Sequence, residues 1–142
     1  IQTKTLECGA RVKFIQPLAF LSFLLVIVGC EEEEHKDIDP STFNQEIALR
    51  TDLNEPEDLI YAYYQPETEG KAKVELTVEE IAESEYRITL IHDGLLDDSQ
   101  RAVKYIMEAE RIDSSWLVSS IKTNWKCWEG RGHEDWGIEY CN

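Results

Sequence analysis

The residues best suited to chemistry are concentrated near the C-terminus, in the stretch NWKCWEGRGHEDWGIEYC (124–141). His133, Glu134 and Asp135 are titratable groups of the kinds used in general acid–base catalysis and in metal binding. Cys127 and His133 together have the composition of a thiol–imidazole pair, in which the imidazole activates the thiol as a nucleophile. Whether this stretch does chemistry depends on how these groups are spaced and held.

Their spacing does not match an established catalytic or metal-binding motif. HEDWG lacks the second histidine of a zinc-protease helix, and the chain has no Gly-x-Ser-x-Gly or phosphate loop. Upstream, His92 precedes Asp93, and a metal site using His92, His133 and nearby carboxylates is possible by residue type, although no ligand spacing supports it. We therefore predict no catalytic residue, metal ligand or cofactor, with a hydrolase or metal-binding protein using the His133 loop as an alternative.

The N-terminal region predicts export. The run FIQPLAFLSFLLVIVG (14–29) is uncharged and follows Arg11 and Lys13, a pattern typical of a secretory signal and short for a membrane span. Its end, IVGC (27–30), resembles the lipobox of bacterial lipoproteins. The resemblance implies that the chain is cleaved before Cys30, which carries palmitate or a related acyl chain. The alternative is an ordinary signal peptide or anchor helix followed by a chance cysteine.

The predicted location is the bacterial cell envelope, with the chain held to the lipid bilayer through acylated Cys30. The acidic run EEEE (31–34) resembles the surface-export signals of some Gram-negative lipoproteins, which favours the outer membrane or cell surface over the inner membrane. The expected organisation is a signal peptide over 1–29, a lipidated cysteine with an acidic tether over 30–53, and one domain over 54–142. Residues 1–11 lack signal character, and a translation start further in, at Val12, is the alternative.

The charge balance limits the class of partner. Of 14 Lys and Arg residues and 29 Asp and Glu residues, three basic residues and one acidic residue precede Cys30, which leaves 11 against 28 and a net charge of −17. Such a surface repels nucleic acid and attracts cations. We expect no nucleic-acid partner, and a cationic envelope protein or peptide if a partner exists.

Two cysteines, Cys127 and Cys141, follow the predicted anchor. In an exported chain, an even number of cysteines predicts that they form disulfides, and here the two would form one. The bond would close a loop of about 15 residues, worth roughly 3 kcal/mol in the chain-entropy model. It would also consume the thiol of Cys127, which argues against the thiol–imidazole pair.

We interpret the loop first as a disulfide-stapled structural cap, with a binding site as the alternative; if a partner exists, we expect it to meet residues 128–136. The candidate binding residues combine aromatic and charged side chains: Trp128, Arg131, His133, Glu134, Asp135 and Trp136. Together with LIHDGLLDDS (90–99), the stretch resembles a family of small, mostly uncharacterised bacterial proteins whose domain ends in a WKC–GRGH–DW–C pattern. The similarity runs from about Pro56 to Cys141. The resemblance implies a single domain and carries over no activity.

The pattern of apolar residues before the loop predicts an α+β fold. NEPEDLIYAYYQP (54–66) predicts a helix with Asn54 as cap, Pro56 in the first turn and Glu57 completing a capping box. Period-two alternation predicts antiparallel strands, which lie at 71–79, 85–92, 102–111 and 116–125. One main helix on a curved four-stranded meander is similar in architecture to the NTF2-like and PepSY-like folds. The function expected is a non-catalytic binding module, with a structural lipoprotein lacking any ligand as the alternative.

Overall fold

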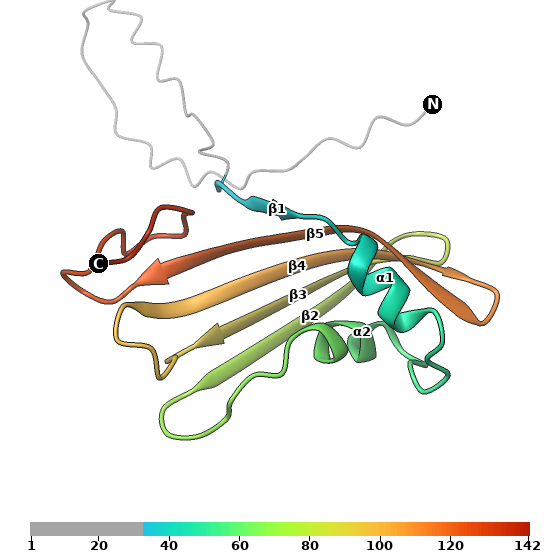
Figure 1. Ribbon diagram of the computed structural model, residues 1–142, viewed down its shortest axis with the longest axis horizontal. Helices are drawn as coiled ribbons and strands as arrows, with labels where there is room; N and C mark the ends of the chain where they lie inside the picture. Colours follow the sequence, from blue (N-terminus) through green and yellow to red (C-terminus); the bar gives the residue numbers. More distant parts are fainter. Residues whose placement is uncertain (1–32) are drawn as a thin grey trace, which may run out of the picture. The chain divides into compact units, whose positions relative to one another are not determined.

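The computed structural model describes residues 33–142, which form a mixed α/β arrangement of two helices on one antiparallel sheet (Figure 1). Within these residues no helix is long and apolar enough to cross a membrane. The predicted signal peptide and Cys30 lie outside the described residues. The elements in chain order are β1 (Lys36–Ile38), α1 (Ser41–Ile47), α2 (Pro56–Tyr63), β2 (Lys73–Ala82), β3 (Glu85–Asp93), β4 (Gln100–Ile112) and β5 (Ser115–Cys127).

The sheet has the order β1-β5-β4-β3-β2, and its four long strands form the predicted meander. Leu76, Leu90 and Tyr105 are direct neighbours across β2, β3 and β4, so the apolar positions of the period-two pattern share one face. Both helices pack on this face, and the core between them and the sheet is apolar. It contains Phe43, Ile47, Leu53, Leu59, Ile60, Ile88, Leu90, Met107, Ala109, Val118 and Ile121.

The predicted strand count and domain boundary need correction. The sheet has five strands, and two helices pack on it. The additional strand and helix are β1 and α1, which belong to the folded unit rather than to an acidic tether. β1 pairs with β5, and Phe43 and Ile47 of α1 are 6% and 5% exposed in the core. Their spacing of four residues places them on one helical face. Even Glu33, within the predicted spacer, forms an ion pair with Lys104.

The start of α2 also differs from the prediction. Glu55 is the N-cap residue, and the carboxylate that closes the box belongs to Asp58 rather than Glu57. Oδ2 of Asp58 accepts the backbone N–H groups of Asn54 and Glu55 at 2.8 and 2.9 Å. A carboxylate in the first turn also interacts favourably with the helix dipole. Pro56 occupies the first turn as predicted.

Three separate parts of the chain complete the β5 edge of the sheet. β1 pairs with residues 121–123. Next to it, the side-chain amide of Asn44 donates to the Val118 carbonyl at 2.8 Å and accepts the Val118 N–H at 2.9 Å. Trp125 forms a bridge with Gly137 of the C-terminal loop. This edge is therefore divided into short pieces, which makes it a poor template for another strand.

A cluster of aromatic rings joins both helices to β4. Tyr63 contacts Phe43 and Tyr105 edge to face, with centroid separations of 5.2 and 5.6 Å, and Tyr64 lies 4.8 Å from Tyr105. Near the other end of β5, the Trp116 indole donates to the carbonyl of Leu53, in the segment before α2, at 2.9 Å. Aromatic contacts thus fix both helices to the sheet.

We expect the aromatic cluster to make the protein less stable at alkaline pH. Burial raises the pKa of Tyr105 to about 12, with added effects from Tyr64 and Tyr63, whereas a tyrosine in an unfolded chain titrates near about 10. The stabilisation is complete below about pH 10 and is lost as pH rises through 12. Because the ring is only partly buried, the loss should be roughly 1–2 kcal/mol.

Urea unfolding between pH 9 and 12 measures this effect. Tyr105→Phe should show a smaller alkaline loss than the wild type, whereas Tyr140→Phe, at a side chain that is 92% exposed, should behave as the wild type does. An unchanged alkaline slope in Tyr105→Phe would assign the loss to other groups.

Candidate functional site

The predicted disulfide between Cys127 and Cys141 is present. Cys127 ends β5 and is 1% exposed, so the bond fixes the C-terminal loop to the buried end of a strand. Gly132 must lie close to this bond. Its φ is +151°, and a Cβ there would be 2.8 Å from Sγ of Cys127, so a larger residue would meet the sulfur.

His133 is used to hold the loop together. Its Nδ1 lies 2.8 Å from the Asp135 carbonyl, and its Nε2 lies 2.9 Å from the Glu139 carbonyl. Both neighbours are acceptors, so the imidazolium form satisfies both contacts and a neutral ring can donate to only one. The ring has no free nitrogen for a substrate or a metal while these contacts persist.

The tryptophans of the loop also make structural contacts. The indole N–H of Trp125 donates to the Glu139 carbonyl at 2.9 Å. The Nζ atoms of Lys104 and Lys126 lie 4.1 and 4.8 Å from the ring centroid of Trp136. Trp128 is 37% exposed, and its indole N–H donates to the Asp97 carbonyl at 2.8 Å. Trp128 therefore combines partial exposure with a fixed position beside the β3–β4 connection.

The charged candidates in the loop lie at its surface. Glu134, Asp135 and Arg131 are all exposed. Within residues 33–142, Arg131 donates to the Asn142 carbonyl at 3.3 Å and forms no ion pair with the nearby carboxylates. The structure thus leaves Trp128, Glu134 and Asp135 exposed, while His133 and Trp136 make contacts within the fold.

Residues of the types that bind metals do cluster at the loop, but two of them are joined in the disulfide. Within the part of the chain that the structure describes, the one group of three such residues is Cys127, His133 and Cys141, with ligand atoms within 4.8 Å of one another. Both sulfurs are shared in the disulfide, so neither is a thiolate that can bind metal or attack a substrate. Among residues 33–142, the metal site considered from His92 and His133 does not occur as such a group.

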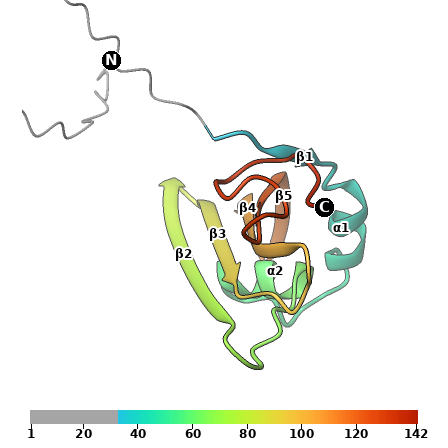
Figure 2. The ribbon, with the colours of Figure 1, turned by 90° about the vertical axis from the view of Figure 1, so that its left-hand side faces the viewer.

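A cleft of about 500 Å³ lies beside the loop, between the end of α2 and the β3–β4 connection. Figure 2 looks onto this end of the sheet, where the C-terminal loop, the β3–β4 connection and the segment after α2 lie together. The charged residues lining the cleft are all acidic, namely Glu67, Glu69 and Asp97. Hydrogen bonds from Gln100 and Ser99 lower the pKa of Asp97, which keeps this carboxylate ionised.

The most buried residue lining the cleft is His92, which is 2% exposed. Its Nδ1 lies 2.8 Å from the hydroxyl oxygen of Tyr64. Its Nε2 is buried and has no hydrogen-bond partner within residues 33–142. Burial, and then the charge of Glu67, raises the pKa of Tyr64, so the phenol stays protonated. Buried polar atoms without a partner are unusual in folded proteins, and within residues 33–142 His35 Nε2, Thr123 Oγ1 and Asn124 Oδ1 share this property.

Sequence reasoning identified His92 only by residue type, as a titratable group and possible metal ligand, and placed Tyr64 only within the helix predicted over 54–66. The two meet because α2 packs against β3, which joins residues 28 positions apart. The sequence signals near these two residues mark the ends of elements. Pro66 follows the end of α2, and Gly94, whose φ is +81°, begins the turn after β3. These signals show where the elements end but not which ends meet.

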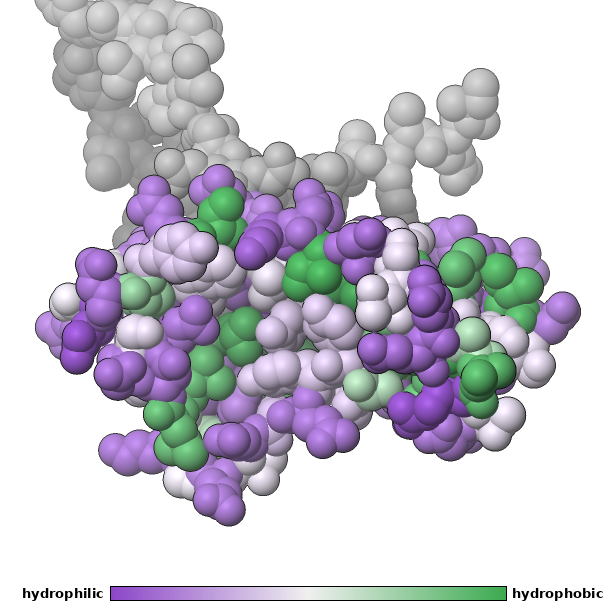
Figure 3. All heavy atoms as spheres, viewed as in Figure 1, coloured by the Kyte–Doolittle hydropathy of each residue, from purple (hydrophilic) through white to green (hydrophobic). Residues whose placement is uncertain are grey.

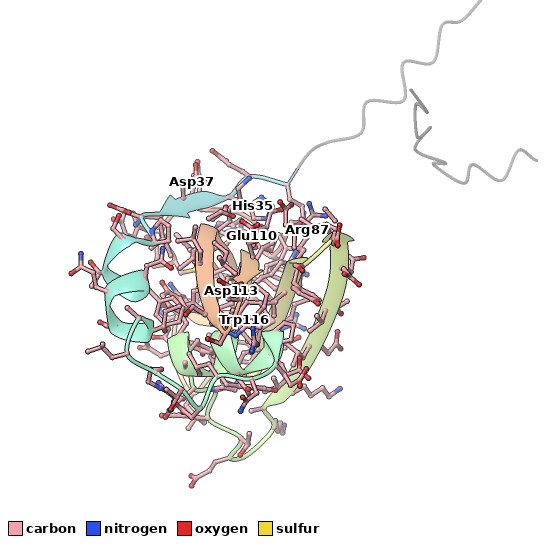
Figure 4. All side chains as sticks on the ribbon, turned by 90° about the vertical axis from the view of Figure 1, so that its right-hand side faces the viewer. His35, Asp37, Arg87, Glu110, Asp113 and Trp116 are labelled. Atoms are coloured by element: carbon pink, nitrogen blue, oxygen red, sulfur yellow. A yellow bond between two sulfur atoms is a disulfide. The ribbon has the colours of Figure 1, made fainter. Side chains whose placement is uncertain are left out.

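A second cleft, of about 820 Å³, lies near β1, where Figure 4 shows His35 and Arg87 facing the same space. Its main charges are already paired. Arg87 binds Glu108 at 2.9 Å, and Lys104 binds Glu33, which lowers the pKa of that carboxyl. These pairs leave less unbalanced charge than the acidic cleft offers.

Comparison with protein-family models, curated proteins and solved structures finds no match to this chain. The functional argument therefore depends on the residues and their geometry.

Proposed function

We propose that this protein is a lipid-anchored protein of the bacterial cell envelope and a non-catalytic binding module for a cationic protein or peptide. The anchor is proposed from the resemblance of IVGC (27–30) to a lipobox. For the architecture, the NTF2-like and PepSY-like folds remain the proposed comparisons, without any function attached.

One observation carries the binding proposal: the charged residues that line the cleft at one end of the sheet are all carboxylates. No lysine or arginine is among the residues that line the cleft beside Tyr64. Trp128 joins the cleft to the loop, because its backbone N–H donates to the Ser99 carbonyl and its indole to the Asp97 carbonyl. Glu134 and Asp135 are exposed on the loop, and Arg101, which is paired with Asp93, lies close enough to Glu134 for their charges to interact.

The rest of the surface supports an electrostatic mode of binding. The face seen in Figure 3 is mainly hydrophilic, with hydrophobic residues in small separate groups rather than one large patch. An acidic surface accelerates encounter with a cationic partner, and salt screens that attraction over a Debye length of about 8 Å at physiological ionic strength. Partly exposed Trp128 offers an aromatic contact once the partner has arrived.

A labelled decalysine peptide tests this function with the full-length protein in detergent. We expect binding at low salt that weakens as salt is added, and no binding of decaglutamate. The triple variant Glu129→Gln/Glu134→Gln/Asp135→Asn should bind about tenfold more weakly, since three surface charge contacts of about 0.5 kcal/mol each sum to this factor.

The matched control is Glu46→Gln/Glu83→Gln/Glu85→Gln, which removes the same charge from exposed positions outside this end. It should lose less than about threefold. Equal losses in the two triple variants would mean that only net charge matters. Absence of binding at every salt concentration would favour the structural lipoprotein without a ligand.

A further inference from the structure

Strand β2 leaves one edge of the sheet open. It pairs with β3 on one side, and among residues 33–142 no strand lies on its other side. Figure 2 shows β2 at the end of the sheet. In an antiparallel sheet, every second residue of an edge strand directs its N–H and C=O groups away from the neighbouring strand. β2 therefore presents backbone donors and acceptors along Lys73–Ala82 that the described residues do not use.

The side chains of β2 alternate between the two faces of the sheet. Val74, Leu76 and Val78 lie on the core face, and Val78 is still 37% exposed. Lys73 and Glu79 lie on the opposite face. Within residues 33–142, Lys73 forms no ion pair, and Glu79 forms only a long one, at 3.9 Å. The strand thus carries apolar surface and charges that a further strand would meet.

A second copy of this chain is a partner whose strand can be matched to β2 residue by residue. Two identical edge strands related by a two-fold axis run antiparallel, and directly opposed side chains point to the same face. Because neighbouring residues alternate between the faces, opposed residues must lie an even number of positions apart. One residue therefore faces its own copy at the axis, and the registers that overlap most of the strand place the axis at residues 75 to 78.

One of these registers matches both the charges and the apolar side chains. With the axis at Leu76, Lys73 of each copy lies opposite Glu79 of the other. On the core face, Val74 lies opposite Val78, and Leu76 lies opposite itself. Opposed pairs of unlike charge and opposed apolar pairs both stabilise an antiparallel ladder. This register also covers apolar surface of Val78 that a single copy leaves exposed.

The neighbouring registers bring unfavourable pairs together. An axis at Glu75 makes this glutamate face itself, and an axis at Thr77 makes Glu75 face Glu79 at two places. An axis at Val78 places an apolar side chain opposite Glu80. Like charges that are directly opposed destabilise a ladder. The charges of β2 therefore act against the other registers and select the one centred on residue 76.

We propose that β2 is a self-association surface, at which two copies of this chain form an antiparallel two-fold dimer with Leu76 at the axis and Lys73 opposite Glu79. The paired residues 73–79 end before the bulge between Glu80 and Ala82. The interface is one strand wide, which is small for a protein interface, so the dimer should be weak and reversible. This inference does not depend on the proposed binding of a cationic partner.

Sedimentation equilibrium of the full-length protein in density-matched detergent measures the dimer, at physiological salt so that distant repulsion between acidic copies is screened. The dimer fraction should rise with protein concentration. Lys73→Glu should weaken association about tenfold or more, because it opposes like charges at two places. Lys36→Glu makes the same charge change on β1, at the opposite edge of the sheet, and should weaken it less than about threefold.

A charge exchange separates the specific pair from net charge. Lys73→Glu/Glu79→Lys has the net charge of the wild type and restores unlike charges at both places. It should recover most of the affinity that Lys73→Glu loses. Arg87, which approaches Glu79, keeps its closer contact with Glu108 at 2.9 Å in this variant, so we expect β2 to stay in place.

Single cysteines test the register. Directly opposed residues of an antiparallel pair lie within the range of a disulfide. Leu76→Cys should therefore cross-link two copies under mild oxidation. Thr77→Cys, whose two copies lie on a diagonal in this register, should cross-link much less. Amide hydrogen exchange of the wild type gives a reading without substitution: alternate N–H groups within 73–79 should exchange more slowly as protein concentration rises.

Several results would overturn the inference. These are the absence of a concentration-dependent dimer, equal weakening by Lys73→Glu and Lys36→Glu, and preferential cross-linking of Thr77→Cys. A dimer whose formation leaves hydrogen exchange within 73–79 unchanged would place the interface elsewhere and would overturn it as well.

Discussion

Removal of the Cys127–Cys141 disulfide is expected to lower the free energy of unfolding by about 3 kcal/mol, because the bond closes a loop of about 15 residues in the unfolded chain. Its two cysteines are 14 positions apart. Cys127 is buried, so alanine is a better replacement than serine, whose hydroxyl would need a partner. For a domain of this size the melting temperature should fall by roughly 10 °C or more.

The double variant Cys127→Ala/Cys141→Ala, compared with the wild type in the presence and absence of reductant, measures this contribution. Reductant should destabilise the wild type about as much as the double substitution does, and should not affect the variant. The effect should extend to the hydrogen bonds of His133, whose ring signals should broaden. A loss below about 1 kcal/mol would mean that loop packing, rather than the cross-link, holds the C-terminus.

Replacement of Cys30 by serine is expected to release the protein from membranes. If Cys30 is acylated, each buried CH₂ group contributes about 0.8 kcal/mol, so several acyl chains on one residue form a stable anchor. The soluble fraction should therefore change from nearly none to nearly all. The same change should abolish incorporation of labelled palmitate.

Cys8→Ser is the matched control, because Cys8 precedes the proposed cleavage position and should not carry lipid. It should leave membrane association and label unchanged. Retention of both label and membrane association in Cys30→Ser would show that the lipoprotein interpretation is wrong.

The long strands could be predicted from the sequence because their alternation continues over many residues and is independent of tertiary context. Val103, Tyr105 and Met107, for example, fall on one face by period alone. β1 and α1 were not predicted. β1 has only three residues, and α1 has a single pair of buried apolar residues, Phe43 and Ile47, so neither segment is long enough to show a periodic pattern. Their stability comes from β5 and the core, which are distant in sequence.

The candidate site was harder to predict for a different reason. The residue types in the loop indicated binding, but the indole of Trp125 and the ring of His133 are directed at backbone carbonyls. Such pairings depend on the path of the loop, which composition does not determine. The contact of Tyr64 with His92 likewise depends on how α2 packs on β3.

The divided β5 edge has a consequence for association between folded molecules. Among residues 33–142, the sheet has one long edge strand, β2, which pairs on only one side. Two molecules could join by placing β2 against β2 around a two-fold axis. The resulting pair would present only the interrupted edge formed by β1, Asn44 and Gly137 at each outer end. Growth by strand addition therefore stops at two copies, and an open-ended fibre requires part of the domain to unfold first.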